Sequence, residues 1–150
     1  MSKVAESTNI QCTLEELESF LDRFFAALPG SGADSVLRVR VPLHGDVAVE
    51  KDVVAHIVDL EHGVGAYKLA IEWKPAGDGP YPRFRGTLGA TAEGAAGPCT
   101  LTMTGEYDPP GGVIGRVFDA PLGALIARVT LRELLARLKT NAERELVHRR

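Results

Sequence analysis

The sequence is poor in the residues that most often mark a function. It has only two cysteines in 150 residues, Cys12 and Cys99, and two distant cysteines make neither a CxxC pair nor a disulfide framework. None of the four histidines has another histidine, a cysteine or a carboxylate at the spacing of zinc ligands. The sequence therefore predicts reduced thiols, no metal site and no cofactor.

Long apolar runs and a strong net charge are also missing. No segment approaches the roughly 18 consecutive apolar residues that a membrane-spanning helix needs, and the first dozen residues contain no apolar export segment. The formal net charge is −3, which provides no general attraction to nucleic acid or to an anionic membrane. We therefore expect a cytoplasmic protein with no integral membrane segment and no nucleic-acid partner.

The composition fits one globular domain that spans residues 1–150. Hydrophobic residues make up 45% of the chain and charged residues 25%, and both fractions are ordinary for a soluble domain. A domain of this length buries roughly 68–70% of the surface of its unfolded chain, which is enough for a core.

The first two thirds of the chain predict one helix and a series of strands. A weak strand is predicted over residues 4–12, and Thr13-Leu14-Glu15-Glu16 then fits a capping box that starts a helix. Alternation of apolar and polar residues predicts strands between Val36 and Tyr107, most clearly from Tyr67 to Trp73. Short connections between consecutive strands favour antiparallel pairing.

The last third changes to apolar spacings of three and four residues, which are typical of a helix. The predicted helix from Ala120 to Leu146 would be about 40 Å long, whereas the radius of gyration expected for this chain is roughly 15 Å. Pro121 predicts a kink or a restart of that helix. The predicted fold class is α+β, with a curved antiparallel sheet of about six or seven strands wrapped around the long C-terminal helix.

This element order resembles the helix-grip superfamily, which includes START domains, Bet v 1-like proteins and bacterial polyketide cyclases and dehydratases. The resemblance is carried by the strand-to-helix junction Gln11–Leu21 and by the tail from Gly115–Asp119 through Leu134–Leu138. It implies a cavity between sheet and helix that holds a hydrophobic or lipid-like small molecule. The chain departs from the family in leaving little room, at residues 31–35, for a second short helix.

Large and small residues are interleaved on the strand face that is predicted to meet the helix. Small residues such as Gly86, Ala90 and Gly105 are expected to leave space beside the larger ones on this face. Pro121 is expected to lie near the mouth of the cavity. The segment from Phe118 to Leu122 is therefore expected to form the opening of the cavity. The residues predicted to bind the ligand are His56, Tyr67, Trp73, Phe84, Met103, Tyr107, Phe118, Leu122 and Leu125.

Three functions remain open at this point. The first is binding or carriage of an apolar or aromatic small molecule. The second is a cyclase- or dehydratase-like enzyme that uses His56, if it faces inward, or the hydroxyl of Tyr67 or Tyr107 as acid or base. The third is an interaction module whose core is filled by its own side chains. No catalytic residue and no oligomeric state is predicted, and Cys99 is interpreted as structural because no histidine lies near it in the sequence.

Overall fold

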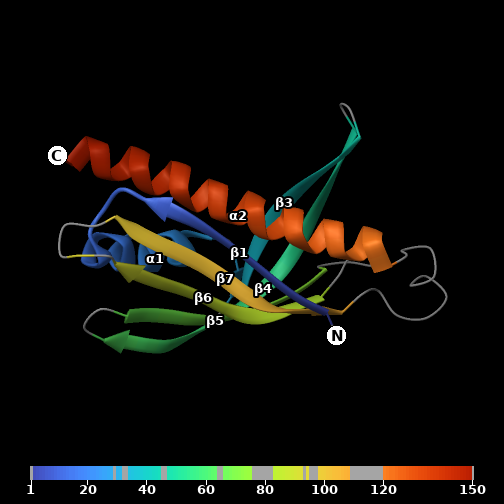
Figure 1. Cartoon of the computed structure of the whole chain (residues 1–150), viewed down its shortest axis with the longest axis horizontal. Coiled ribbons are helices and arrows are strands. Elements are labelled where there is room, and N and C mark those ends of the chain that lie inside the picture. Colours follow the sequence, from blue (N-terminus) through green and yellow to red (C-terminus); the bar gives the residue numbers. More distant parts are fainter. Residues whose placement is uncertain are drawn as a thin grey trace.

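A computed structural model describes residues 2–28, 30–31, 34–44, 47–63, 66–75, 83–92, 94, 98–108 and 120–149. One antiparallel sheet carries all the described strands, and two helices pack beside it (Figure 1). The helices are α1 (Leu14–Ala27) and α2 (Ala120–Arg149). The strands are β1 (Ser2–Ile10), β2 (Gly30–Ser31), β3 (Asp34–His44), β4 (Val47–Gly63), β5 (Ala66–Pro75), β6 (Arg83–Ala92) and β7 (Cys99–Asp108).

The predicted α+β class, with a curved antiparallel sheet and a C-terminal helix, is confirmed. Five consecutive strands, β3 to β7, form a meander, whereas about six or seven strands were predicted for the sheet. At its two edges β1 pairs with β7, and the two-residue β2 pairs with β3, so that the complete order is β1-β7-β6-β5-β4-β3-β2. Within the described chain only β2 lies between α1 and β3, as the short connection predicted.

Helix α1 begins as its sequence predicts. The Thr13 hydroxyl accepts a hydrogen bond of 3.1 Å from the amide of Glu16, and the Glu16 carboxylate accepts one of 3.0 Å from the amide of Thr13. These two bonds satisfy amide groups that have no acceptor within the helix. The capping box thereby fixes the point at which the chain turns from β1 into α1.

Replacing Thr13 with alanine is expected to lower the free energy of unfolding by about 1 kcal/mol, because one of these amides loses its acceptor. Chemical denaturation followed by circular dichroism measures the change. Ser19→Ala is the matched control, since it removes an exposed hydroxyl from the same helix outside the cap. An equal effect of the two substitutions would contradict the capping role.

Helix α2 begins at Ala120, so Pro121 is its second residue. The amides of a first turn have no acceptor within the helix, and proline is tolerated there. Pro121 therefore lies at the start of the helix and does not kink its interior. Residues 111–119 lie outside the described part of the chain.

Polar contacts attach the middle of α2 to the sheet. Arg132 Nε donates to the carboxylate of Glu6 on β1 over 3.1 Å, and Arg137 donates to the backbone oxygen of Arg38 on β3 over 2.8 Å. In the part of the chain that the structure describes, no helix is long and apolar enough to cross a membrane.

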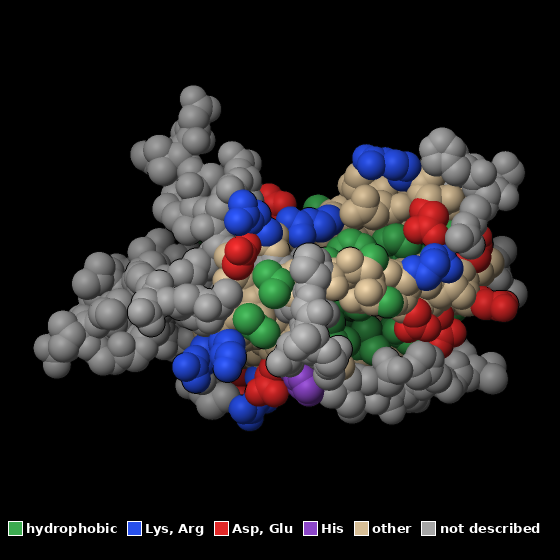
Figure 2. All heavy atoms as spheres, turned by 180° about the vertical axis from the view of Figure 1, so that it is seen from behind, with side chains coloured by type: hydrophobic (Ala, Val, Ile, Leu, Met, Phe, Trp, Pro, Cys, Tyr) green, Lys and Arg blue, Asp and Glu red, His purple; other side chains and the backbone are tan. Residues whose placement is uncertain are grey.

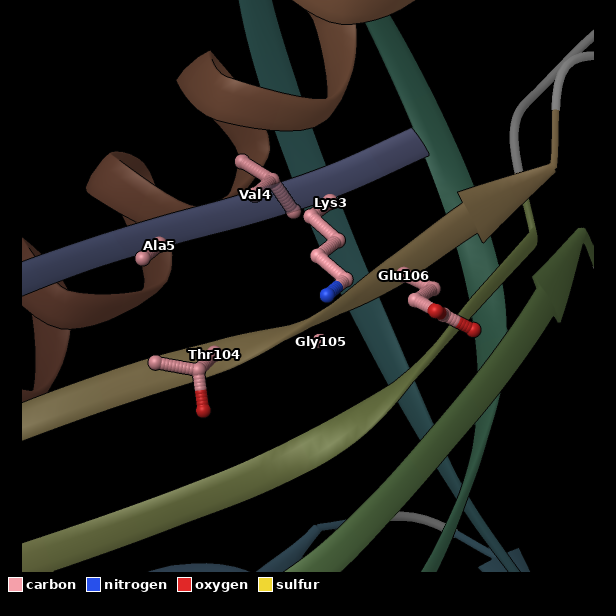
Figure 3. Close-up of a pocket in the computed structure, with 6 residues that line it drawn as sticks. All are labelled: Lys3, Val4, Ala5, Thr104, Gly105 and Glu106. Atoms are coloured by element: carbon pink, nitrogen blue, oxygen red, sulfur yellow. The ribbon is translucent and has the colours of Figure 1, made fainter. Parts of the chain in front are cut away.

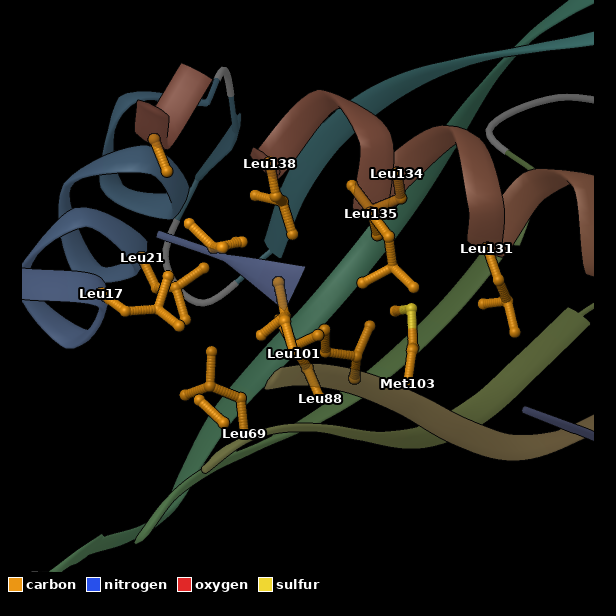
Figure 4. Packing of buried hydrophobic residues seen from close by; sticks show 14 of the residues in the cluster. Leu17, Leu21, Leu69, Leu88, Leu101, Met103, Leu131, Leu134, Leu135 and Leu138 are labelled. Atoms are coloured by element: carbon orange, nitrogen blue, oxygen red, sulfur yellow. The ribbon is translucent and has the colours of Figure 1, made fainter. Parts of the chain in front are cut away.

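The core lies between the sheet and the two helices. Leucines from α2 point toward the inner face of β6 and β7, and Leu17 and Leu21 of α1 close the core at one end (Figure 4). The fully buried side chains in this region include Leu17, Leu21, Leu69, Leu88, Leu101, Met103, Leu131 and Leu138. The interior beneath this part of α2 is therefore a packed core.

Candidate functional site

Three of the predicted ligand-binding residues lie side by side across the inner face of the sheet. Trp73 on β5 pairs with Phe84 on β6, and Phe84 pairs with Tyr107 on β7. All three residues are at most 5% exposed. The rings of Trp73 and Phe84 are stacked, with centroids 4.4 Å apart and planes inclined by 24°. We call Trp73, Phe84 and Tyr107 the aromatic row.

The aromatic row lies at the end of the sheet where α2 begins. Tyr107 is the penultimate residue of β7 and pairs with Ser2, the first residue of β1. Figure 1 shows the start of α2 at the same end of the molecule as the start of β1. The row is therefore the part of the hydrophobic core that lies toward the beginning of the helix.

Two glycines make room for the ring of Phe84. Gly86 and Gly105 pair directly across β6 and β7. A Cβ atom built on either residue would lie less than 3 Å from Cζ of Phe84, at 2.7 Å from Gly86 and 2.8 Å from Gly105. The expectation that these small residues leave open space is wrong at this point, because the Phe84 ring occupies it.

Met103 is the next inward-facing residue on β7 beside Gly105, and it is fully buried. It pairs with Leu88 on β6, and Leu131 and Leu135 of α2 approach it from above (Figure 4). Met103 therefore belongs to the packed core beneath the helix.

Tyr67 is buried near the opposite end of β5, where its hydroxyl reaches α1. The hydroxyl donates a 2.9 Å hydrogen bond to Oδ1 of Asp22, and the residue is 1% exposed. A buried tyrosine hydroxyl usually finds a partner of this kind. The contact ties the sheet to α1, and sequence reasoning missed it because 45 residues separate the two partners.

His56 is exposed and lies on the outer face of the sheet. Its neighbour Ala55 is 3% exposed on the inner face, and His56 pairs with the exposed Glu72 of β5. An inward orientation was the condition for His56 to act as a base in the cavity, and this condition is not met.

The remaining predicted residues belong to the start of α2 and the segment before it. Leu125 is 48% exposed and is not enclosed by the core. Leu122 lies in the first turn of α2, but its side chain is outside the described part of the structure, as is all of Phe118. An exposed leucine at this position adds apolar surface near the beginning of the helix.

The two cysteines are far apart in sequence but close in the fold. Cys99 is fully buried, and its thiol donates to the backbone oxygen of Cys12 over 3.2 Å. Burial raises the pKa of the Cys99 thiol, the hydrogen bond to Cys12 opposes the rise, and the Glu16 carboxylate adds to it. A buried thiol with a raised pKa is a poor nucleophile, in agreement with a structural role for Cys99.

Two of the hollows lined by described residues lie at the surface. One, with a volume of about 380 Å³, lies beside β1 and β7 (Figure 3). Val4 in its lining faces the core, whereas Lys3, Ala5, Thr104 and Glu106 lie on the opposite face of the sheet. The other, of about 590 Å³, lies between α1 and the C-terminal half of α2. No group of three or more histidine, cysteine or acidic residues suited to a metal occurs among the residues described.

The molecule viewed from behind shows hydrophobic side chains in the middle of that face (Figure 2). Basic and acidic side chains lie around them and are interspersed.

Two of the ion pairs on the outer face of the sheet join neighbouring strands: Arg85 with Glu72 at 2.9 Å, and Arg38 with Asp52 at 2.9 Å. Exposed pairs of this kind contribute little to stability.

No protein-family model matches the sequence, and no curated protein matches it. Solved structures do match. A conserved protein from Geobacillus kaustophilus has a TM-score of 0.64 and 17% identity, over 95% of this chain and 96% of that one. A ZhuI aromatase/cyclase from a Streptomyces species has a TM-score of 0.58 and 13% identity, over 97% and 95% of the two chains. A Thermus thermophilus protein has a TM-score of 0.54 and 14% identity, over 94% and 97%. At these identities the likeness concerns the fold alone.

Proposed function

We propose that the chain is a helix-grip protein that binds an apolar or aromatic small molecule at the aromatic row, between the curved sheet and the beginning of α2. The observation that carries this proposal is the stacked pair of Trp73 and Phe84 beside Tyr107, at the end of the sheet where α2 begins. Pockets for small molecules are mostly apolar and aromatic, with few polar groups. The fold likeness to an aromatase/cyclase supports a cavity-forming scaffold.

The packed core limits where the ligand lies in this proposal. Leu88, Leu101 and Met103 are fully buried beneath α2, so the middle of the sheet offers little room. The ligand would lie beside the aromatic row and the first turns of α2, where Leu125 already exposes apolar surface. A ligand at this position would cover Leu125 and extend the stack that Trp73 and Phe84 begin.

The single tryptophan of the chain provides a direct test, because Trp73 belongs to the aromatic row. Titration with N-phenyl-1-naphthylamine, a neutral apolar fluorophore, is expected to show saturable energy transfer from Trp73 to the bound probe. Tyr107→Leu should weaken binding about tenfold, which corresponds to about 1.4 kcal/mol. His56→Ala is the control on the outer face and should leave the affinity unchanged.

Circular dichroism of each variant distinguishes the loss of the binding site from the loss of the folded structure. Equal affinity of the wild-type protein and a folded Tyr107→Leu variant would contradict the proposed position of the ligand. The absence of saturable energy transfer with this probe would favour the interaction module with a filled core.

A cyclase-like enzyme is the second candidate, and the likeness to an aromatase/cyclase favours it. Tyr107 would then be the acid or base, because His56 is exposed and the Tyr67 hydroxyl is bonded to Asp22. Tyr107→Phe separates the two functions: it should abolish turnover of a polyketide-like substrate if the hydroxyl transfers a proton. Binding of the neutral probe should be unchanged by that substitution in either case.

A further inference from the structure

The hollow between the two helices has the features of a second ligand site. Its floor is apolar: Phe20 is 3% exposed, and its ring centroid lies 5.8 Å from that of the half-buried Phe24. Ala27, one turn further along α1, adds a small side chain to the lining. The hollow is open to solvent and has a volume of about 590 Å³. We call this hollow the interhelix groove.

The rim of the interhelix groove carries more positive than negative charge. Arg23 of α1 forms an ion pair with Glu145 of α2, which joins the two helices across the groove. Arg144 and Asn141 also line it. Among the residues that the structure describes, no carboxylate pairs with Arg144. The rim therefore presents two guanidinium groups against one carboxylate, next to an aromatic floor.

We propose that the interhelix groove binds a small amphiphile that joins one carboxylate to an apolar chain or ring. Arg144 would hold the carboxylate through charge-assisted hydrogen bonds, with the Asn141 amide as a second donor. The apolar part would lie against Phe24 and Ala27. An acidic head and an apolar body match the rim and the floor of the groove, respectively.

This site does not depend on the proposed function at the aromatic row. Arg144 and Asn141 follow Leu138 on α2, whereas the aromatic row lies near the beginning of that helix. Along α2, the core leucines Leu131 to Leu138 (Figure 4) lie between the beginning of the helix and Asn141. Binding at one site can therefore be removed while the other is left intact.

A pair of ligands with eight carbons each, one with an anionic carboxylate and one with a neutral hydroxyl as its head group, tests the proposal. Octanoate and 1-octanol are titrated into the wild-type protein, and binding is followed by the NMR shifts of the Asn141 side-chain amide. Octanoate is expected to bind about tenfold more tightly than 1-octanol, since a hydrogen bond to a charged group is worth about a factor of ten or more. Arg144→Gln should remove this tenfold preference and leave the weaker binding of 1-octanol unchanged.

Arg128→Gln is the matched control. Arg128 is an exposed arginine of the same helix, but it lies 3.8 Å from Glu6 of β1 and does not line the groove. This variant should keep the preference for octanoate. Phe24→Ser should weaken both ligands about tenfold while its circular dichroism spectrum remains that of the wild-type protein.

Three results would overturn the proposal. The first is an equal loss of octanoate binding in Arg128→Gln and Arg144→Gln, which would indicate a general charge effect. The second is octanoate binding that Tyr107→Leu removes and Arg144→Gln does not, which would place the ligand at the aromatic row. The third is the absence of any shift of the Asn141 amide at millimolar octanoate.

Discussion

Replacing Trp73 with alanine is expected to lower the free energy of unfolding by about 3–5 kcal/mol, the usual cost of truncating a buried aromatic side chain. Trp73 is 5% exposed, and its ring is stacked on that of Phe84 at 4.4 Å. The indole is large, and its neighbours lie on strands of the sheet that cannot move inward without disturbing the hydrogen-bond ladder. A cavity should therefore remain where the ring was.

Urea denaturation followed by far-ultraviolet circular dichroism measures this change, because the variant has no tryptophan fluorescence. Lys74→Ala is the control, since Lys74 is the exposed neighbour of Trp73 on β5 and its truncation should change the free energy of unfolding by at most about 0.5 kcal/mol. Trp73→Phe keeps an aromatic ring and should cost less than Trp73→Ala. A loss below about 1 kcal/mol for Trp73→Ala would mean that the residue does not pack on the inner face.

The sequence predicted those parts of the fold that depend on local signals. The alternation from Tyr67 to Trp73 identified the inner face of β5, and Tyr67, Leu69, Ile71 and Trp73 are each at most 5% exposed. The capping box at Thr13 identified the start of α1. Both signals act within a few residues, so neither requires knowledge of the partner strands.

The predictions that were wrong or missing concern residues whose positions depend on contacts between different strands and helices. β4 has apolar residues on both faces around His56, so alternation could not determine on which face the histidine lies. Its register with Glu72 on β5 places it outside. The bond from Tyr67 to Asp22 likewise depends on how α1 packs against the sheet, and residue spacing alone contains no signal for it.

The candidate site shows the same division between local and nonlocal signals. The sequence correctly placed large aromatic residues among small ones on the inner face, but it predicted open space at Gly86 and Gly105. Only the pairing of β6 with β7 brings these two glycines together beneath the ring of Phe84. The alternation of residues along a strand therefore identifies which side chains face the core. The pairing register of the strands determines whether those side chains enclose a cavity or fill it.

The pair of glycines leads to the second large effect: Gly105→Ala is expected to lower the free energy of unfolding by about 3 kcal/mol, at the upper end of the usual cost of overpacking. A Cβ atom at Gly105 would lie 2.3 Å from the backbone oxygen of Arg85 and 2.6 Å from Cα of Gly86. These are backbone atoms of the paired strand, so they cannot give way as a flexible side chain would. The strands must separate, or the ladder between β6 and β7 must shift.

Gly89→Ala is the matched control because Gly89 lies on β6, and the nearest atoms to an added Cβ there, on Lys68 and Tyr67, are 3.9 Å away. Alanine at this position should be neutral or stabilise the strand by about 0.5–1 kcal/mol. Thermal and urea denaturation of both variants provide the comparison. Because a methyl group at Gly105 would lie 2.8 Å from the Phe84 ring, folded Gly105→Ala protein should also bind N-phenyl-1-naphthylamine more weakly than the Gly89→Ala protein. Equal stability of the two variants would show that β6 and β7 do not approach each other closely at this pair.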